Sequence, residues 1–167
     1  MTNIKENTIS DYFEVEKTKP IASGEHCQVY NYTKTKVLKV VHYKCSGQLT
    51  FMEFCKQQKT NKEHLPKIYD VKTHGRKTYI LMEKLEEVGD DMYSIQESSE
   101  SVGWFESDTA MWKGLSDSLD ELLDDMEYWF GDLTEKVGTY LHDWDLHAGN
   151  IMIRPSDKKL VVVDPWA

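Results

Sequence analysis

The sequence predicts an α+β fold, in which a small antiparallel sheet with one helix precedes a mainly helical part and a closing hairpin. Three observations lead to this prediction. Runs rich in β-formers, separated by glycine and polar turns, occupy residues 19–83. A leucine and methionine stripe at helical spacing occupies residues 111–126, and two short apolar runs occupy residues 150–163.

The first half of the chain contains the predicted sheet. The pattern predicts two strands joined by a turn over residues 19–43, and two more strands over residues 64–71 and 77–83 around a His74-Gly75 turn. Between these pairs, apolar residues at near-helical spacing and helix-favouring Gln, Lys and Glu predict a helix over residues 48–60. We therefore expect one small antiparallel sheet with one helix.

The second half is predicted to be mainly helical until its last residues. Asp108 can cap a helix in which one face of residues 111–126 is apolar and the other acidic. An apolar stripe continues over residues 133–141. The chain then closes with a predicted hairpin of residues 150–153 and 159–163.

Composition and charge exclude several classes of function. The 167 residues are 40% hydrophobic, which is enough to fill the core of one domain, and the formal net charge of −9 would repel nucleic-acid backbones. No apolar run reaches the roughly 18–20 residues of a membrane span, and the first residues lack the apolar core of a signal peptide. Three cysteines without C-x-x-C spacing disfavour disulfides and structural zinc. We therefore expect a cytoplasmic protein that binds neither nucleic acid nor membrane.

The polar segment before the closing hairpin carries the strongest candidates for chemistry, and it reads D-L-H-A-G-N from Asp145 to Asn150. Phosphoryl transfer needs a carboxylate that orients the accepting hydroxyl and oxygen ligands that hold Mg²⁺ on the phosphates. Asp145 and Asn150 can supply both. Asp164 follows a strand of buried type and would face Asn150 across the hairpin, so the pattern predicts a magnesium site of Asn150 and Asp164.

Two other interpretations of this segment stay open. Asp145 and Asn150 are residue types that often cap a turn without any chemical role. His142, Asp145 and His147 also have the side chains that hold a single transition-metal ion. In the phosphotransfer interpretation, His147 organises the loop rather than reacting.

The motif D-L-H-A-G-N, followed by apolar strands and V-V-V-D, resembles the catalytic loop and metal-binding aspartate of protein kinases and of aminoglycoside-type phosphotransferases. The chain is similar to the early serine/threonine protein kinases of tailed bacteriophages. The likeness lies in its short length, its V-L-K-V strand and the D-P that follows its last strand. The resemblance extends over about residues 19–165. It implies a single minimal two-lobed kinase-like domain over 1–167, with an N-lobe over 12–82, a hinge at 83–85 and a reduced C-lobe over 86–167.

The resemblance also assigns roles to individual residues. Residues 21–30 resemble the glycine-rich phosphate loop, with Gly24 as the glycine that is kept, and V-L-K-V resembles the strand whose lysine, here Lys39, contacts the α- and β-phosphates. Glu53 would pair with Lys39, and residues 80–85 resemble the hinge that holds adenine. The implied ATP-binding residues are Ala22, Gly24, Cys27, Val29, Lys39, Glu53, Glu83 and Leu85, the implied catalytic residues are Asp145, Lys39 and Asn150, and the implied Mg²⁺ ligands are Asn150 and Asp164.

The resemblance implies an ATP- and Mg²⁺-dependent phosphotransferase with ATP between the lobes. The implied acceptor is a serine or threonine hydroxyl on a host or partner protein, or on the chain itself. Ala22 and Cys27 stand where kinases usually have glycines, and Trp144 stands where they have an arginine. These departures leave open an inactive kinase-like protein that binds and inhibits a partner. The likeness to antibiotic phosphotransferases leaves open a small-molecule acceptor.

The charge distribution gives an expectation about partners. Residues 83–135 carry about seventeen acids against two lysines, whereas residues 1–82 carry about fourteen Lys and Arg against eight acids. Such an acidic surface is usually only solvated, but it would also attract a basic host or partner protein. Because the sequence stops three residues after Asp164, we also expect a homodimer or a partner protein to complete the short C-lobe.

Overall fold

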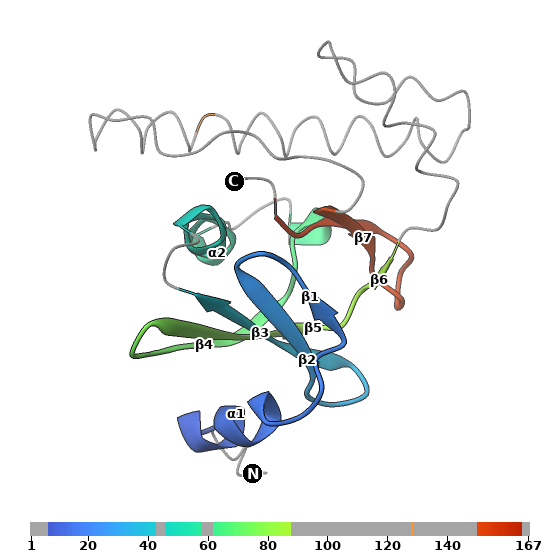
Figure 1. The fold of residues 1–167 in the computed structure, drawn as a ribbon. Coiled ribbons are helices and arrows are strands. Elements are labelled where there is room, and N and C mark those ends of the chain that lie inside the picture. Colours follow the sequence, from blue (N-terminus) through green and yellow to red (C-terminus); the bar gives the residue numbers. More distant parts are fainter. Residues whose placement is uncertain (1–6, 43–45, 58–61, 88–127, 129–149, 165–167) are drawn as a thin grey trace, which may run out of the picture. The chain divides into compact units, whose positions relative to one another are not determined.

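The structure is a computed structural model that describes residues 7–42, 46–57, 62–87, 128 and 150–164 (Figure 1). The chain divides into two compact units, each made of two stretches of sequence. Unit 1 comprises Met1–Cys45 and Lys67–Lys84, and unit 2 comprises Ser46–Pro66 and Leu85–Ala167. The lobe boundaries expected from the sequence stay a prediction.

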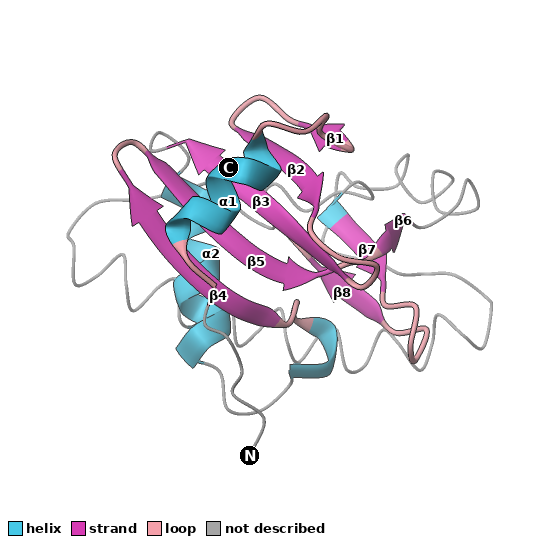
Figure 2. Cartoon of the chain, turned by 90° about the horizontal axis from the view of Figure 1, so that it is seen from below, coloured by secondary structure: helices cyan, strands magenta, loops and turns pink. Residues whose placement is uncertain are grey.

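Unit 1 contains a five-stranded antiparallel sheet of order β1-β2-β3-β5-β4 (Figure 2). The strands are β1 (Ala22–Ser23), β2 (Cys27–Asn31), β3 (Lys36–His42), β4 (Ile68–His74) and β5 (Lys77–Glu83). The turn from β4 to β5 contains Gly75 with a φ of 61°, a left-handed conformation that glycine adopts at little cost. The α+β class and the antiparallel sheet are thereby confirmed.

The strand expected over residues 64–71 has other bounds in the structure, where β4 is Ile68–His74. The strand expected from residue 64 begins only at Ile68, and His64 lies instead in the short 3₁₀ helix η1 (Lys62–His64). Pro66 between them has no N–H to donate to a strand ladder, which explains the later start. The chain therefore enters β4 two residues after this proline.

Helix α1 (Ile9–Glu16), which the sequence analysis did not predict, packs against the sheet of unit 1. A capping box starts the helix: the Thr8 hydroxyl accepts from the Asp11 N–H at 3.3 Å, and the Asp11 carboxylate accepts from the Thr8 N–H at 2.7 Å. The fully buried Tyr12 anchors α1 in the core. The buried core residues between α1 and the sheet are Tyr12, Tyr30, Leu38, Val40, Tyr79 and Leu81.

Unit 2 contains helix α2 (Ser46–Gln57), η1 and a three-stranded antiparallel sheet of order β6-β7-β8. The strands are β6 (Glu86–Glu87), β7 (Ile151–Ile153) and β8 (Leu160–Val162). In the β7–β8 hairpin, which the sequence predicted, Ile151 lies opposite Val162. Helix α2 is the helix expected over residues 48–60. The helix expected over 111–126 and the stripe over 133–141 lie outside the described residues.

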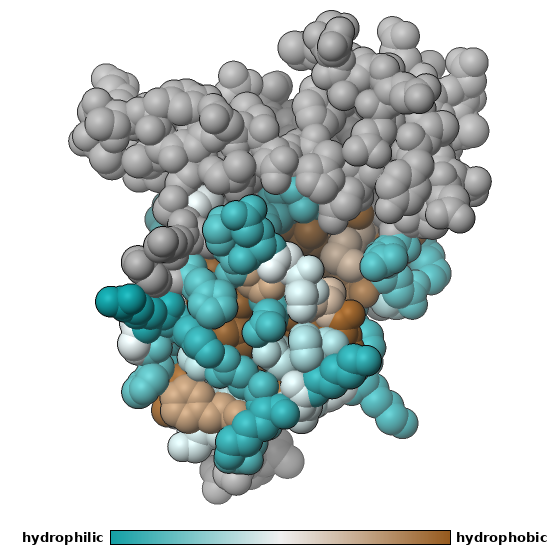
Figure 3. All heavy atoms as spheres, viewed as in Figure 1, coloured by the Kyte–Doolittle hydropathy of each residue, from teal (hydrophilic) through white to brown (hydrophobic). Residues whose placement is uncertain are grey.

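The surface of the described residues mixes polar and apolar side chains, as the face drawn in Figure 3 shows. Large apolar side chains exposed among these residues include Ile21 and Tyr69. The Tyr69 ring is partly screened by the Lys36 ammonium, which lies 4.2 Å from the ring centroid. Within the described parts of the chain, no helix combines the length and the apolar character needed to cross a membrane.

Candidate functional site

Three residues that were expected to bind nucleotide form one row across the sheet of unit 1. In the strand register Ala22 lies opposite Val29, and Val29 lies opposite Lys39. Directly opposed residues project from the same face of a sheet, with Cβ atoms about 4.5–5.5 Å apart. Ile80 and Val71 continue the row on β5 and β4. The register therefore aligns two apolar side chains and one ammonium group of the expected site.

This row projects from the sheet face opposite α1. Leu38 and Val40 belong to the core that contains Tyr12 of α1, and successive residues of a strand alternate between its two faces. Lys39 therefore points away from α1, and so does Cys27, which is two residues before Val29 on β2. Lys39 is only 8% exposed. Lysine is rarely this buried without contacts that compensate its charge, so Lys39 is not an ordinary surface lysine.

The turn between β1 and β2 contains Gly24 and corresponds to the expected phosphate loop. The Gly24 N–H donates to the Cys27 carbonyl at 2.9 Å, and the His42 N–H donates to the His26 carbonyl at 3.0 Å, which ties the turn to β3. Gly24 does not have the left-handed conformation that Gly75 has. A Cβ at Gly24 would lie 3.4 Å from the Cys27 Sγ, at about van der Waals contact. The backbone of this turn therefore does not itself require a glycine.

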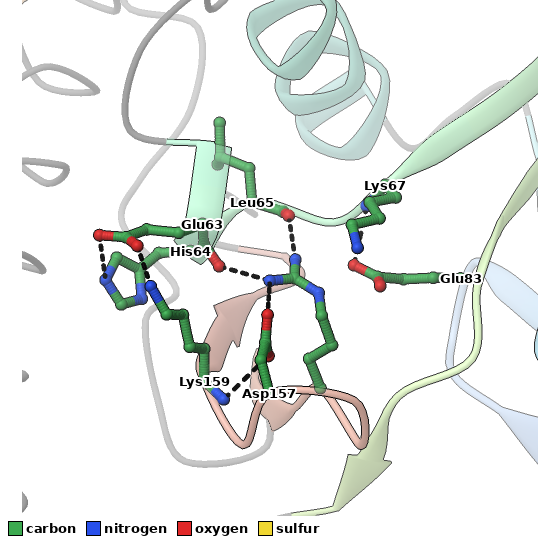
Figure 4. A network of polar contacts seen from close by, with 8 residues as sticks. Glu63, His64, Leu65, Lys67, Glu83, Asp157 and Lys159 are labelled. Atoms are coloured by element: carbon green, nitrogen blue, oxygen red, sulfur yellow. Dashed lines mark hydrogen bonds and ion pairs between the residues drawn. The ribbon is translucent and has the colours of Figure 1, made fainter.

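The expected hinge residues are largely engaged in backbone contacts within unit 1. Glu83 is buried, and its carboxylate accepts from the Lys67 N–H at 2.9 Å, as Figure 4 shows. The Glu83 N–H donates to the Lys67 carbonyl at 3.0 Å, and the Lys84 N–H donates to the Thr35 carbonyl at 2.9 Å. Glu83 thus has both its carboxylate and its N–H engaged with Lys67, and the adenine contacts expected of Glu83 and Leu85 stay a prediction.

Asn150 and Asp164 stand at the same end of the β7–β8 hairpin in unit 2. Asn150 immediately precedes β7, and Asp164 follows β8 by two residues. The Val163 N–H donates to the Asn150 carbonyl at 2.9 Å, so the pairing continues one step beyond Ile151 and Val162. Amide and carboxylate oxygens suit a hard cation such as Mg²⁺. The donor types at this end of the hairpin therefore fit the metal that the sequence implied.

Gln48 of α2, which the sequence analysis did not single out, contacts this end of the hairpin. Its side-chain Nε2 donates a hydrogen bond to Oδ2 of Asp164. Gln48 is 6% exposed and lies in the first turn of α2. A glutamine that starts a helix is unremarkable in a sequence, and the 116 positions between the two residues hide the contact. The sequence signal that could have identified Gln48 is a polar residue in line with the apolar face of the predicted helix.

Glu53 of α2 is exposed, and the contacts described for its carboxylate are with neighbours on its own helix. The Gln57 side-chain amide donates to Glu53 Oε1 at 3.2 Å, and the Lys56 ammonium lies 3.9 Å from Glu53 Oε2. The pairing of Glu53 with Lys39 stays a prediction.

Asp145 lies outside the described residues, so its catalytic role also stays a prediction. The alternative transition-metal site, which adds His142 and His147, lies outside them too. Among the residues that the structure does describe, no three His, Cys, Asp or Glu side chains gather into a metal-binding group.

The buried Arg154 connects the hairpin to η1 through a network of polar contacts, and Figure 4 labels its partners. Its guanidinium donates to the Glu63 carbonyl at 2.7 Å and to the Leu65 carbonyl at 2.8 Å, and it lies 3.5 Å from the Asp157 carboxylate. Arg154 is 2% exposed. The Lys159 ammonium bonds to the Glu63 carboxylate and holds the pKa of that carboxyl below its usual range. This network fixes the hairpin that carries Asn150 and Asp164.

No protein-family model matches this chain, and no curated protein matches it either. Among solved structures it is similar to WbdD. A crystal structure of monomeric WbdD is 14% identical with a TM-score of 0.43, and the match covers 83% of this chain and 32% of that one. A co-crystal structure of WbdD with the kinase inhibitor LY294002 is 15% identical with a TM-score of 0.44, covering 85% and 31%.

A further WbdD structure, described as a bifunctional kinase-methyltransferase, is 16% identical with a TM-score of 0.40, and the match covers 83% of this chain and 29% of that one. This chain thus spans about a third of the length of the WbdD chains that it matches. A likeness at this level assigns neither a site nor an activity to this chain.

Proposed function

We propose that this chain is an ATP- and Mg²⁺-dependent phosphotransferase that transfers the γ-phosphate to a serine or threonine hydroxyl of a protein. The observation that carries the proposal is the position of Asn150 and Asp164 at one end of the β7–β8 hairpin. The D-L-H-A-G-N segment runs directly into this hairpin at Asn150, so the proposed base Asp145 is five residues from a proposed metal ligand. Phosphoryl transfer requires a base and a metal site to be held close together.

The row of Ala22, Val29 and Lys39 in unit 1 gives independent support to the proposal. The two apolar side chains offer a surface for the nucleoside, and the ammonium of Lys39 would neutralise charge on the α- and β-phosphates. A buried cation acts more strongly on such charge than an exposed one, because little water screens it. Leu85 would supply the backbone contact to adenine.

In the proposed reaction, Asp145 orients the accepting hydroxyl and takes its proton. The hydroxyl oxygen forms a bond to the γ-phosphorus while the bond from that phosphorus to the β–γ bridging oxygen breaks, and ADP leaves. Asn150 and Asp164 would hold Mg²⁺, which when bound neutralises charge on the β- and γ-phosphates. Lys39 keeps the remaining phosphates in place throughout.

The proposal is tested by incubating the purified protein with Mg²⁺ and γ-labelled ATP, alone and with a cell lysate. Lys39→Ala and Asp145→Asn variants are assayed beside Lys36→Ala as the control. We expect the wild type and Lys36→Ala to label serine or threonine residues of protein. The Lys39→Ala and Asp145→Asn variants should not produce this label. Label on a small molecule instead would indicate a small-molecule phosphotransferase.

Two further outcomes would contradict phosphotransfer. If nothing is labelled but nucleotide still raises the melting temperature, the chain is a kinase-like binding protein. If nucleotide neither reacts nor stabilises the fold, the proposed ATP site is wrong.

A further inference from the structure

We propose that Gln48 is a positioning residue for Asp164, and that it holds the carboxylate in the orientation in which it binds a divalent cation. This inference rests on the proposed function, because it concerns the same metal site. It concerns the hydrogen bond from Gln48 Nε2 to Asp164 Oδ2, which joins the start of α2 to the residue after the β7–β8 hairpin within unit 2.

Gln48 is held in place by the packing of its helix. Phe51 and Phe54 of α2 are fully buried and stack with ring centroids 6.4 Å apart, and Met52 is buried as well. Gln48 itself lies one turn before Phe51 and Met52 and is also buried. Because the helix is anchored on this side, the Gln48 amide is presented from a fixed backbone rather than from a mobile loop.

Asp164, in contrast, lies beyond the paired part of its strand. β8 ends at Val162, and the last hairpin bond in this direction is the one from the Val163 N–H to the Asn150 carbonyl. The strand ladder therefore fixes the backbone up to Val163 but does not determine the side-chain torsions of Asp164. The hydrogen bond from Gln48 Nε2 constrains these torsions from a second element of unit 2.

The amide donor of Gln48 is chemically compatible with an Asp164 carboxylate that binds a metal ion. A carboxylate offers about four lone-pair positions on its two oxygens, so a hydrogen bond to Oδ2 is compatible with a cation bound to the same carboxylate. An amide is neutral and leaves the negative charge of Asp164 in place, whereas a lysine or arginine at this position would neutralise the charge and compete with a metal. Gln48 Oε1 and Asp164 Oδ1 are both shielded from solvent, which strengthens electrostatic interactions at this point.

The test compares Gln48→Met with Gln57→Met. Methionine keeps the length of the side chain and removes the N–H donor, and Gln57 is an exposed glutamine on the same helix. Binding of Mn²⁺ is measured by electron paramagnetic resonance in the presence of a non-hydrolysable ATP analogue, which requires no turnover. Asp164→Asn is the reference, and the melting temperature of each variant without metal is recorded.

We expect Gln48→Met to raise the Mn²⁺ dissociation constant about 10–100-fold, which is the usual cost of removing a group that orients a metal ligand. Gln57→Met should bind Mn²⁺ like the wild type. If Gln48→Met does not fold, Gln48→Asn, which is one methylene too short to reach Asp164, takes its place with the same expectation. A lowered melting temperature with unchanged Mn²⁺ affinity would mark a purely structural contact and overturn the inference.

The same measurement separates this inference from the proposed function. If Asp164→Asn abolishes Mn²⁺ binding while Gln48→Met matches Gln57→Met, the metal site stands and the role of Gln48 is wrong. If Asp164→Asn binds Mn²⁺ as the wild type does, the metal site itself is wrong, and the role of Gln48 is overturned with it.

Discussion

The Val163 N–H donates a 2.9 Å hydrogen bond to the carbonyl of Asn150, and this bond brings Asn150 next to the residue that precedes Asp164. Two proposed metal ligands that are fourteen positions apart in the chain thereby become neighbours at one end of a hairpin. Their relative position depends on the integrity of this hairpin. At its other end, the Arg154 N–H donates to the Lys159 carbonyl at 2.8 Å and closes the turn.

Arg154→Lys should destabilise the protein, because one ammonium cannot reproduce the fork that donates to the carbonyls of Glu63 and Leu65. Leaving a buried carbonyl without its donor costs about 1–3 kcal/mol, so we expect a loss of that size in the free energy of unfolding. Urea denaturation measures it. Arg76→Lys, in the exposed turn before β5, is the control and should change stability by less than about 0.5 kcal/mol. Equal losses in both variants would contradict the role of Arg154.

Glu16→Gln should weaken the docking of α1 in a pH-dependent way. Burial by itself raises the pKa of Glu16, but the hydrogen bonds from Lys77 and Tyr79 outweigh it and hold this pKa below its usual range. A carboxyl with a lowered pKa in the folded state stabilises the fold above its unfolded pKa, and that stabilisation is lost as the pH falls through the folded value.

We therefore expect Glu16→Gln to cost about 1–3 kcal/mol near neutral pH, and the difference from wild type to shrink steadily below about pH 4. Thermal unfolding at a series of pH values measures this. Glu14→Gln is the matched control, because Glu14 is exposed on the same helix and pairs with Lys17 at 2.6 Å. A difference that stays constant with pH would refute the ionic contribution of Glu16.

Gly24→Ala should fold normally but bind ATP less tightly. The turn has no left-handed conformation at Gly24, and the added Cβ would only touch the Cys27 Sγ, so we expect a stability change under about 1 kcal/mol. The methyl group would, however, keep the backbone of the turn from approaching the phosphates. Calorimetric titration of ATP measures the affinity.

Gly75→Ala is the complementary control for this turn. Because Gly75 has a φ of 61°, alanine there should cost about 1–2 kcal/mol of stability and leave the ATP affinity unchanged. Unchanged ATP affinity in Gly24→Ala would show that the β1–β2 turn does not approach the phosphates.

The sequence predicted those elements whose pattern is local. The runs of β-forming residues in β3 and β5, the apolar spacing of α2 and the pair of apolar runs that form the β7–β8 hairpin can each be recognised within a few residues. Helix α1 has only eight residues, and its stability comes from the burial of Tyr12 against the sheet rather than from helix propensity. The local signal that could have predicted α1 is its capping box, in which Thr8 is followed three residues later by Asp11.

The parts of the site that the sequence analysis missed depend on long-range contacts. Gln48 acts on Asp164 across 116 positions, and Arg154 acts on Glu63 and Leu65 across 91 and 89. Neither a glutamine nor an arginine indicates a functional role by its residue type alone. Gln48 and Arg154 stand out only because both are buried in the fold. Lys39, Asn150 and Asp164 could be proposed from the sequence because each lies in a short motif, whereas Gln48 and Arg154 do not.

The most direct test of the account compares the ATP affinity of Lys39→Met with that of Lys36→Met, measured by calorimetric titration in the presence of Mg²⁺. Both lysines lie on β3, and strand alternation directs them to opposite faces of the sheet. We predict that Lys39→Met raises the ATP dissociation constant at least about tenfold, because the buried charge that we propose contacts the phosphates is lost, while Lys36→Met binds ATP like the wild type. Equal affinities in the two variants would contradict a nucleotide site on the row of Ala22, Val29 and Lys39.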